Sequence, residues 1–177
     1  MAYSLQDFCF DVRQILGYRD DSAGRDQVRA RLEILLADPD FRAKHIGSKA
    51  SIGMTEIHKD EQMGFCVLAY NMDASRQSPP HDHGRSWAVY GQAEGHTDMT
   101  LWKEGSGKIR ADRTFRLNAG EAGLFDVQEI HSIEYVAGAK FVRVTGIDMS
   151  SEPRRVFDPK TGSVKEIESI GTGSGPA

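Results

Sequence analysis

The chain has 177 residues, of which 27% are charged and 39% hydrophobic, and its formal net charge is −4. These values are typical of one soluble globular domain. The weak acidic balance argues against a nucleic-acid partner, and no apolar run approaches the roughly 18 residues of a membrane span. Cys9 and Cys66 are too few for a disulfide framework, and Asp7 and Asp11 interrupt the apolar run of a secretory peptide. We therefore expect a cytoplasmic protein.

The first 50 residues have a helical pattern. Over residues 4–16, apolar side chains recur at three- and four-residue spacing, with Ser4 as a suitable start and Gly17 as a suitable stop. A second amphipathic stretch covers residues 25–37 and ends before Asp38 and Pro39. We expect a helical segment over residues 1–50 that packs on the rest of the chain.

From residue 51 onward the pattern changes to short strands with polar turns between them. These apolar or alternating runs cover residues 64–70, 86–90, 96–102, 113–117, 123–127, 132–136 and 141–147. Many short strands at regular spacing predict a mainly β, antiparallel sandwich or barrel over residues 51–165. The Gly- and Ser-rich end predicts a flexible tail over residues 166–177, so that one domain results overall.

A histidine pair stands at the entry to one predicted strand. Residues i and i+2 of an extended strand project to the same face, so the imidazoles of His81 and His83 can reach one metal ion. Asp82 between them points the other way, which argues against a direct role as a ligand. The preceding Pro79 and Pro80 restrict the backbone and favour a fixed ligand geometry.

The run around this pair resembles the first motif of the cupin superfamily, G(x)5HxH(x)3–4E(x)6G. His81 and His83 match its histidines and Gly95 matches its last glycine, whereas Ala88 stands at the position of the glutamate ligand. The resemblance implies a metal site that lacks the usual carboxylate.

Residues 120–131 resemble the second cupin motif, G(x)5PxG(x)2H(x)3N, in spacing. Gly120 and His131 are kept, and the other three motif residues are replaced. Together the two motifs imply a cupin double-stranded β-helix, or jelly-roll barrel, in which His81, His83 and His131 bind the metal.

Over roughly residues 1–160 the chain is more closely similar to the cysteine dioxygenase family of thiol dioxygenases. These cupins lack the glutamate ligand and hold Fe(II) with three histidines; the His-Asp-His run, Gly95, and Glu134 three residues after His131 are shared features. The resemblance implies an iron dioxygenase that uses O2 on a small thiol or related anionic substrate, with Ni, Mn or Zn as alternative metals. Three neutral imidazoles leave the 2+ charge uncompensated and positions open for a thiolate and O2.

Several family features are missing. Ala88 and Asp148 stand where the family has its cysteine–tyrosine crosslink, and Val144, Gly146 and Asp148 replace its serine–histidine–tyrosine relay. Thr55 stands near the position of the arginine that binds the substrate carboxylate. These departures indicate a relative that acts on another substrate than cysteine.

Three further residues are candidates for the site. Arg85 follows the histidine pair and can form bidentate contacts with an anionic substrate. Asp148 can replace the missing tyrosine as a polar group of the pocket. Glu129, two residues before His131, is either a fourth ligand, a hydrogen-bond acceptor for an imidazole, or a solvated turn carboxylate. Tyr90 shares face parity with neither histidine, which predicts that it points away from the pocket.

Two other functions fit the same sequence. In one, the metal acts as a Lewis acid in an isomerase, lyase or hydrolase; in the other, the barrel is a non-catalytic module that binds a metabolite. In every case we expect a small-molecule ligand, no nucleic acid and no membrane. Pairing through edge strands makes a homodimer possible beside a monomer.

Overall fold

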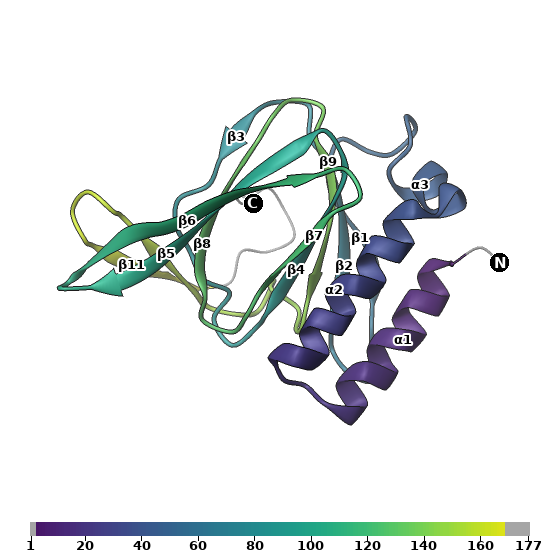
Figure 1. The fold of residues 1–177 in the computed structure, drawn as a ribbon, viewed down its shortest axis with the longest axis horizontal. Coiled ribbons are helices and arrows are strands. Elements are labelled where there is room, and N and C mark those ends of the chain that lie inside the picture. The colour runs from purple at the N-terminus through teal and green to yellow at the C-terminus, as the bar shows by residue number, and fades with distance from the viewer. Residues whose placement is uncertain (1–2, 169–177) are drawn as a thin grey trace.

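The computed structural model describes residues 3–168 (Figure 1). Within this range three helices precede eleven strands. The helices are α1 (Leu5–Tyr18), α2 (Ser22–Ala37) and α3 (Pro39–His45), and the strands are β1 (Gly53–Lys59), β2 (Cys66–Asn71), β3 (Arg76–Gln77), β4 (Ala88–Glu94), β5 (His96–Gly105), β6 (Lys108–Asn118), β7 (Ala122–Phe125), β8 (Ile130–Tyr135), β9 (Lys140–Thr145), β10 (Arg154–Phe157) and β11 (Val164–Ile167). No helix among the described residues has the length and apolar character needed to cross a bilayer.

Local signals begin each helix. Ser4 forms a capping box with Asp7 at the start of α1, as its spacing predicts. The helix continues one residue beyond Gly17, and α2 begins at Ser22, three residues before the predicted start. Asp38 ends α2 and also accepts a hydrogen bond from the Phe41 N–H as the N-cap of α3. One residue therefore stops one helix and starts the next.

The strands form two antiparallel sheets that face each other. One has the order β1-β2-β9-β4-β7 and the other β3-β8-β5-β6, while β10 and β11 form a separate hairpin. Neighbours such as β2 with β9 and β5 with β8 are distant in the sequence, which is the jelly-roll type of connection. The predicted mainly β fold with an N-terminal helical segment is confirmed, although the two sheets do not join into a closed barrel.

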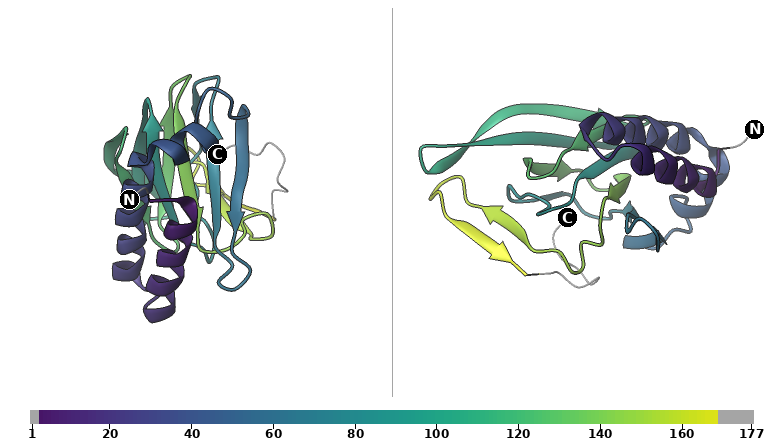
Figure 2. Two further views of the ribbon diagram at one scale, coloured as in Figure 1. Left: turned by 90° about the vertical axis from the view of Figure 1, so that its right-hand side faces the viewer. Right: turned by 90° about the horizontal axis from the view of Figure 1, so that it is seen from below.

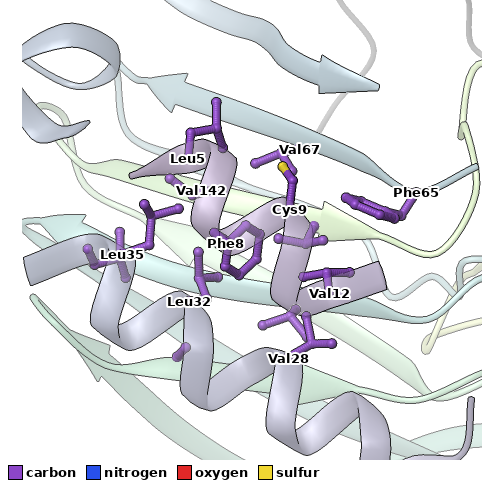
Figure 3. Close-up of a cluster of buried hydrophobic side chains, with 14 of the residues drawn as sticks. Leu5, Phe8, Cys9, Val12, Val28, Leu32, Leu35, Phe65, Val67 and Val142 are labelled. Atoms are coloured by element: carbon purple, nitrogen blue, oxygen red, sulfur yellow. The ribbon is translucent and has the colours of Figure 1, made fainter. Parts of the chain in front are cut away.

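The helices cover the outer face of the five-stranded sheet (Figure 2). Apolar side chains of α1 and α2 pack there against side chains of β2, β9 and the segment before β2 (Figure 3). The labelled helix residues are Leu5, Phe8, Cys9, Val12, Val28, Leu32 and Leu35, and the labelled sheet-side residues are Phe65, Val67 and Val142. At Gly91 of β4, an added Cβ would lie 2.7 Å from side-chain carbons of Leu32 and Leu36. The absence of a side chain thus lets α2 lie directly on the sheet.

A second apolar cluster fills the space between the two sheets. It includes Tyr70 of β2, Tyr90 of β4, Phe125 of β7 and Phe141 of β9. Because both faces of the five-stranded sheet are buried, its central strands have continuous apolar runs instead of a strict alternation.

The C-terminal boundary differs from the sequence prediction. β11 extends to Ile167, so the predicted tail over residues 166–177 begins inside a strand that pairs with β10. Residues 169–177 of that tail lie outside the described residues. The physical reason is the pairing partner: Val156 opposite Lys165 and Phe157 opposite Val164 complete a hairpin that the composition alone does not reveal.

Candidate metal centre

The first histidine is held between two strands. His81 exchanges two backbone hydrogen bonds with His131 of β8, each 2.9 Å long, and its other side pairs with Val156 of β10. Its ring Nδ1 donates to the Pro79 carbonyl at 2.9 Å. This bond fixes the tautomer and leaves Nε2 as the nitrogen that is free to bind a metal.

The three predicted ligands come together. Nitrogen atoms of His81, His83 and His131 lie within 4.8 Å of one another. The ring centroids are 4.7 Å to 5.3 Å apart, and the three residues are at most 2% exposed. This is a compact, buried set of donors from two segments about 50 residues apart in the sequence.

Several ring nitrogens lack a partner. His81 Nε2, His83 Nδ1 and both nitrogens of His131 are buried without a hydrogen-bond partner in the described part of the chain. Tyr90 Oη lies 3.3 Å from His83 Nε2. Buried polar atoms that remain unpaired are costly, and a metal ion among these rings would satisfy one nitrogen of each ring. The residues therefore fit a divalent metal that binds imidazole nitrogen.

Burial keeps the histidines neutral. It lowers the pKa of His81 to about 4, with a smaller opposing effect from the hydrogen bond to Pro79. The pKa of His83 lies well below 6.5 because of burial and then because of the neighbouring His131 and His81. The pKa of His131 is also well below 6.5, mainly because of burial and then because of His81, while an interaction with the Glu129 backbone raises it. Neutral imidazole is the form that binds a metal.

No carboxylate joins this set within residues 3–168. Asp82 turns away, as predicted, and accepts hydrogen bonds from Arg155 Nε at 2.7 Å and from the Arg155 N–H at 2.9 Å. Glu129 instead accepts from the backbone N–H of Asp126 at 2.7 Å, which is the turn role among the alternatives. Ala88, at the position of the cupin glutamate, is fully buried.

Two ion pairs connect the histidine segment with the C-terminal part of the chain, one to a residue just before β10 and one to a residue within β10. Asp82 binds Arg155, and in the reverse direction Arg85 binds Glu152, with Nη2 2.9 Å from Oε2. Both carboxylates are buried, whereas the Arg85 side chain is 84% exposed. Gly84 fits between them with φ +60, because an added Cβ would lie 2.3 Å from the Pro153 carbonyl oxygen. The structure thus places Arg85 in an ion pair at the surface and not beside the three rings.

The positions of the family relay also lie elsewhere. Val144 packs in the helix-facing core, and Asp148 forms an ion pair with Lys59 at 2.6 Å. An added Cβ at Gly146 would lie 2.4 Å from Trp87 Nε1, so no larger residue fits there without movement. Asp148 is therefore not brought to the three histidines.

The prediction for Tyr90 is wrong, and Arg143 is a residue near the centre that the sequence pattern did not single out. Tyr90 does not point outward: it is 1% exposed, its hydroxyl lies beside His83, and its ring centroid is 5.7 Å from that of His131. Arg143 of β9 is 7% exposed, and its Cζ lies 5.3 Å and 6.0 Å from the ring centroids of Tyr70 and Tyr90. The available signal for Arg143 is a charged residue in the middle of the apolar strand Phe141–Val144.

Comparisons with known proteins give limited similarity. No protein-family model matches the chain, and no curated protein matches it. Similar solved structures include the Schizosaccharomyces pombe Cnp3 cupin domain, at 14% identity and TM-score 0.43, over 54% of this chain and 64% of that one. KdgF from Halomonas sp. matches at 14% identity and TM-score 0.43, over 52% and 74% of the two chains. A cupin superfamily protein from Desulfitobacterium hafniense matches at 12% identity and TM-score 0.44, over 55% and 79%.

These matches cover about half of this chain and less than two thirds of the Cnp3 domain. At such identities no residue role can be transferred from them.

Proposed function

We propose that this protein is a metal-dependent oxidoreductase of the cupin type, in which His81, His83 and His131 hold Fe(II) for the dioxygenation of a small thiol. The observation that carries the proposal is the buried set of three neutral imidazoles without a carboxylate. Imidazole nitrogens suit Fe, Ni and Zn, so the choice of iron rests on the similarity to thiol dioxygenases.

The charge of the ligand set determines what binds next. Neutral histidines leave the full 2+ charge of the ion, and three ligands leave room for further donors. An anionic thiolate is favoured over a neutral group under these conditions. When bound, Fe(II) supplies the redox chemistry that transfers both atoms of O2 to the sulfur, so that the thiolate becomes a sulfinate.

Residues of the chain itself prepare this centre. The Pro79 carbonyl fixes the orientation of the His81 ring, and Tyr90 holds a hydroxyl next to His83. Burial of all three rings excludes bulk water and strengthens electrostatic interactions inside the site. The cysteine–tyrosine crosslink and the relay of the similar enzymes have no counterpart, so we propose a small anionic thiol other than cysteine.

Oxygen uptake tests the proposal. The protein is reconstituted anaerobically with Fe(II) or Zn(II) and then mixed with O2 and a panel of small thiols at an oxygen electrode. We expect oxygen uptake with the Fe(II)-loaded protein but not with the Zn(II)-loaded protein, and a sulfinate product that contains two added oxygen atoms. His83→Ala should lose metal and uptake together, while His96→Ala, a histidine at the start of β5, should keep both.

Three results would contradict this proposal or its ligand assignment. The absence of oxygen uptake with every thiol would exclude the dioxygenase. Turnover of a substrate with Zn(II) as fast as with Fe(II) would instead support the Lewis-acid alternative. Stoichiometric metal in His83→Ala would show that the ligand assignment is wrong.

A further inference from the structure

We propose that Arg143 forms an anion-binding subsite beside the metal centre and binds the acidic group of the substrate. This inference rests on the proposed function, because it assumes that the substrate also contacts the metal. It extends that function by naming the ligand class: a small thiol acid that carries one negative charge on sulfur and a second on a carboxylate or a similar group.

The Arg143 side chain carries a buried charge without a carboxylate partner in the described part of the chain. Arg143 is 7% exposed, and its Nε has no hydrogen-bond partner in the described part of the chain. None of the ion pairs found within residues 3–168 includes it. A guanidinium remains protonated at neutral pH even when it is buried, so this side chain carries a full positive charge between the two sheets.

Two tyrosine side chains are the partners of this charge in the described part of the chain, and Tyr90 also interacts with it as a hydrogen-bonding side chain. The guanidinium carbon lies 5.3 Å from the Tyr70 ring centroid and 6.0 Å from that of Tyr90. Such contacts contribute much less than the desolvation of a buried ion costs. An anionic ligand would compensate the charge and can bind the guanidinium through two parallel hydrogen bonds.

Arg143 also lies close to the metal centre. Arg143 of β9 lies opposite Tyr90 of β4 in the register of the sheet. The Tyr90 hydroxyl lies 3.3 Å from His83 Nε2, so one side chain contacts the metal centre and also faces the guanidinium. A substrate a few carbons long can therefore place its sulfur at the metal and its acidic group at Arg143.

The two arginines closest in sequence to Asp82 and β10 that form ion pairs, and the position that the resemblance indicates, do not provide this subsite. Arg85 is bound to Glu152, and Arg155 is bound to Asp82. Thr55, near the position that the thiol dioxygenase resemblance assigns to the substrate arginine, lies exposed on β1. The subsite thus lies on a different strand from the one that the resemblance indicates.

Binding to the Zn(II)-loaded protein tests the subsite without oxygen chemistry. Isothermal titration calorimetry compares mercaptoacetate with 2-mercaptoethanol, and 3-mercaptopropionate with 3-mercapto-1-propanol. Each pair keeps the thiol and the chain length and changes only the charge of the other end. In at least one of the two pairs, we expect the acid to bind about 10- to 100-fold more tightly than the matching alcohol, as for charge-assisted hydrogen bonds.

Arg143→Gln should bring this ratio close to one, while the exposed control Arg110→Gln should leave it unchanged. Arg143→Lys keeps the charge but loses the planar guanidinium, so it should keep part of the preference for the acid. This variant replaces Arg143→Gln in the test if Arg143→Gln does not fold. Circular dichroism and zinc content establish that each variant retains the fold and the metal.

The inference is overturned if wild-type protein binds acid and alcohol equally, or if Arg143→Gln retains the acid preference. Its failure is separable from failure of the proposed function. An acid preference without oxygen uptake on iron would leave the subsite and remove the dioxygenase, whereas uptake without an acid preference would do the opposite.

Discussion

Asp82→Asn changes one atom of the carboxylate that stands between the two neighbouring histidines in the sequence. Asp82 accepts hydrogen bonds from Arg155 Nε at 2.7 Å and from the backbone N–H groups of Arg155 and Gly84 at 2.9 Å and 3.2 Å. The amide oxygen of Asn can still accept from the backbone, but its NH2 group then faces the guanidinium. The variant therefore leaves Arg155 without its counter-charge and weakens the link between His81 and β10.

The cost follows from the burial of the two partners. Removal of one partner of a fully buried pair costs about 3–5 kcal/mol, and an exposed pair contributes less than about 1 kcal/mol. The Asp82 side chain is 1% exposed and that of Arg155 is 40% exposed, so water can partly solvate the remaining charge. We expect a loss of about 2 kcal/mol in the free energy of unfolding, between these limits. Metal affinity should fall by about tenfold, as for other residues that orient metal ligands.

Urea denaturation of the metal-free protein measures the first quantity, and competition with a zinc chelator measures the second. Asp98→Asn is the matched control, because Asp98 binds Arg116 with similar geometry but is 31% exposed. It should lose less than about 1 kcal/mol and keep its metal affinity. Equal effects of the two variants, or an unchanged zinc affinity in Asp82→Asn, would refute the positioning role of the buried ion pair.

Three further predictions concern the centre and the core. His83→Ala should abolish stoichiometric metal binding, measured by elemental analysis, because two imidazoles hold the ion much more weakly than three. Metal-free protein should lose stability as the pH falls from 6.5 toward 4, because over this range His81 takes up a proton in the unfolded chain but not in the folded one. The lowering of the His81 pKa to about 4 corresponds to a loss of about 3 kcal/mol in the free energy of unfolding. Urea titrations at stepped pH measure this loss, and a free energy of unfolding that does not change with pH would contradict the prediction. Gly91→Val should lower the free energy of unfolding by about 2 kcal/mol, because its Cβ would lie 2.7 Å from side-chain carbons of Leu32 and Leu36. Urea unfolding measures this loss, and an unchanged zinc affinity of the variant would show that the effect is one of packing.

Local chemistry made much of the fold predictable. The capping box at Ser4 and the apolar spacing that follows it act within one helix and need no tertiary contact. The hairpin of β10 and β11 could not be predicted in the same way. β10 is held by pairing with His81 and by the Asp82–Arg155 ion pair, which both depend on residues about 70 positions earlier.

Face parity explains which site residues the sequence reveals. His81 and His83 lie on one extended segment, so the spacing of two predicts their common direction. This parity does not continue to Tyr90, because Gly84 has a positive φ and the Ser86 N–H bonds to the His83 carbonyl in a turn. Tyr90 consequently points into the space between the sheets, where a count from the histidines predicts the opposite direction.

Charged groups around the metal centre are distributed unevenly. The two buried carboxylates closest in sequence to the histidines and to β10, Asp82 and Glu152, both bind arginines that are partly or largely exposed. Within residues 3–168 no carboxylate joins the three neutral imidazoles or pairs with the Arg143 guanidinium, so a bound divalent ion would add to an already positive charge. Such a site selects its ligand by negative charge and leaves reactivity to the metal. Exchange of the metal should then change the reaction while the acid preference persists, and substitution of Arg143 should remove the preference while metal binding persists.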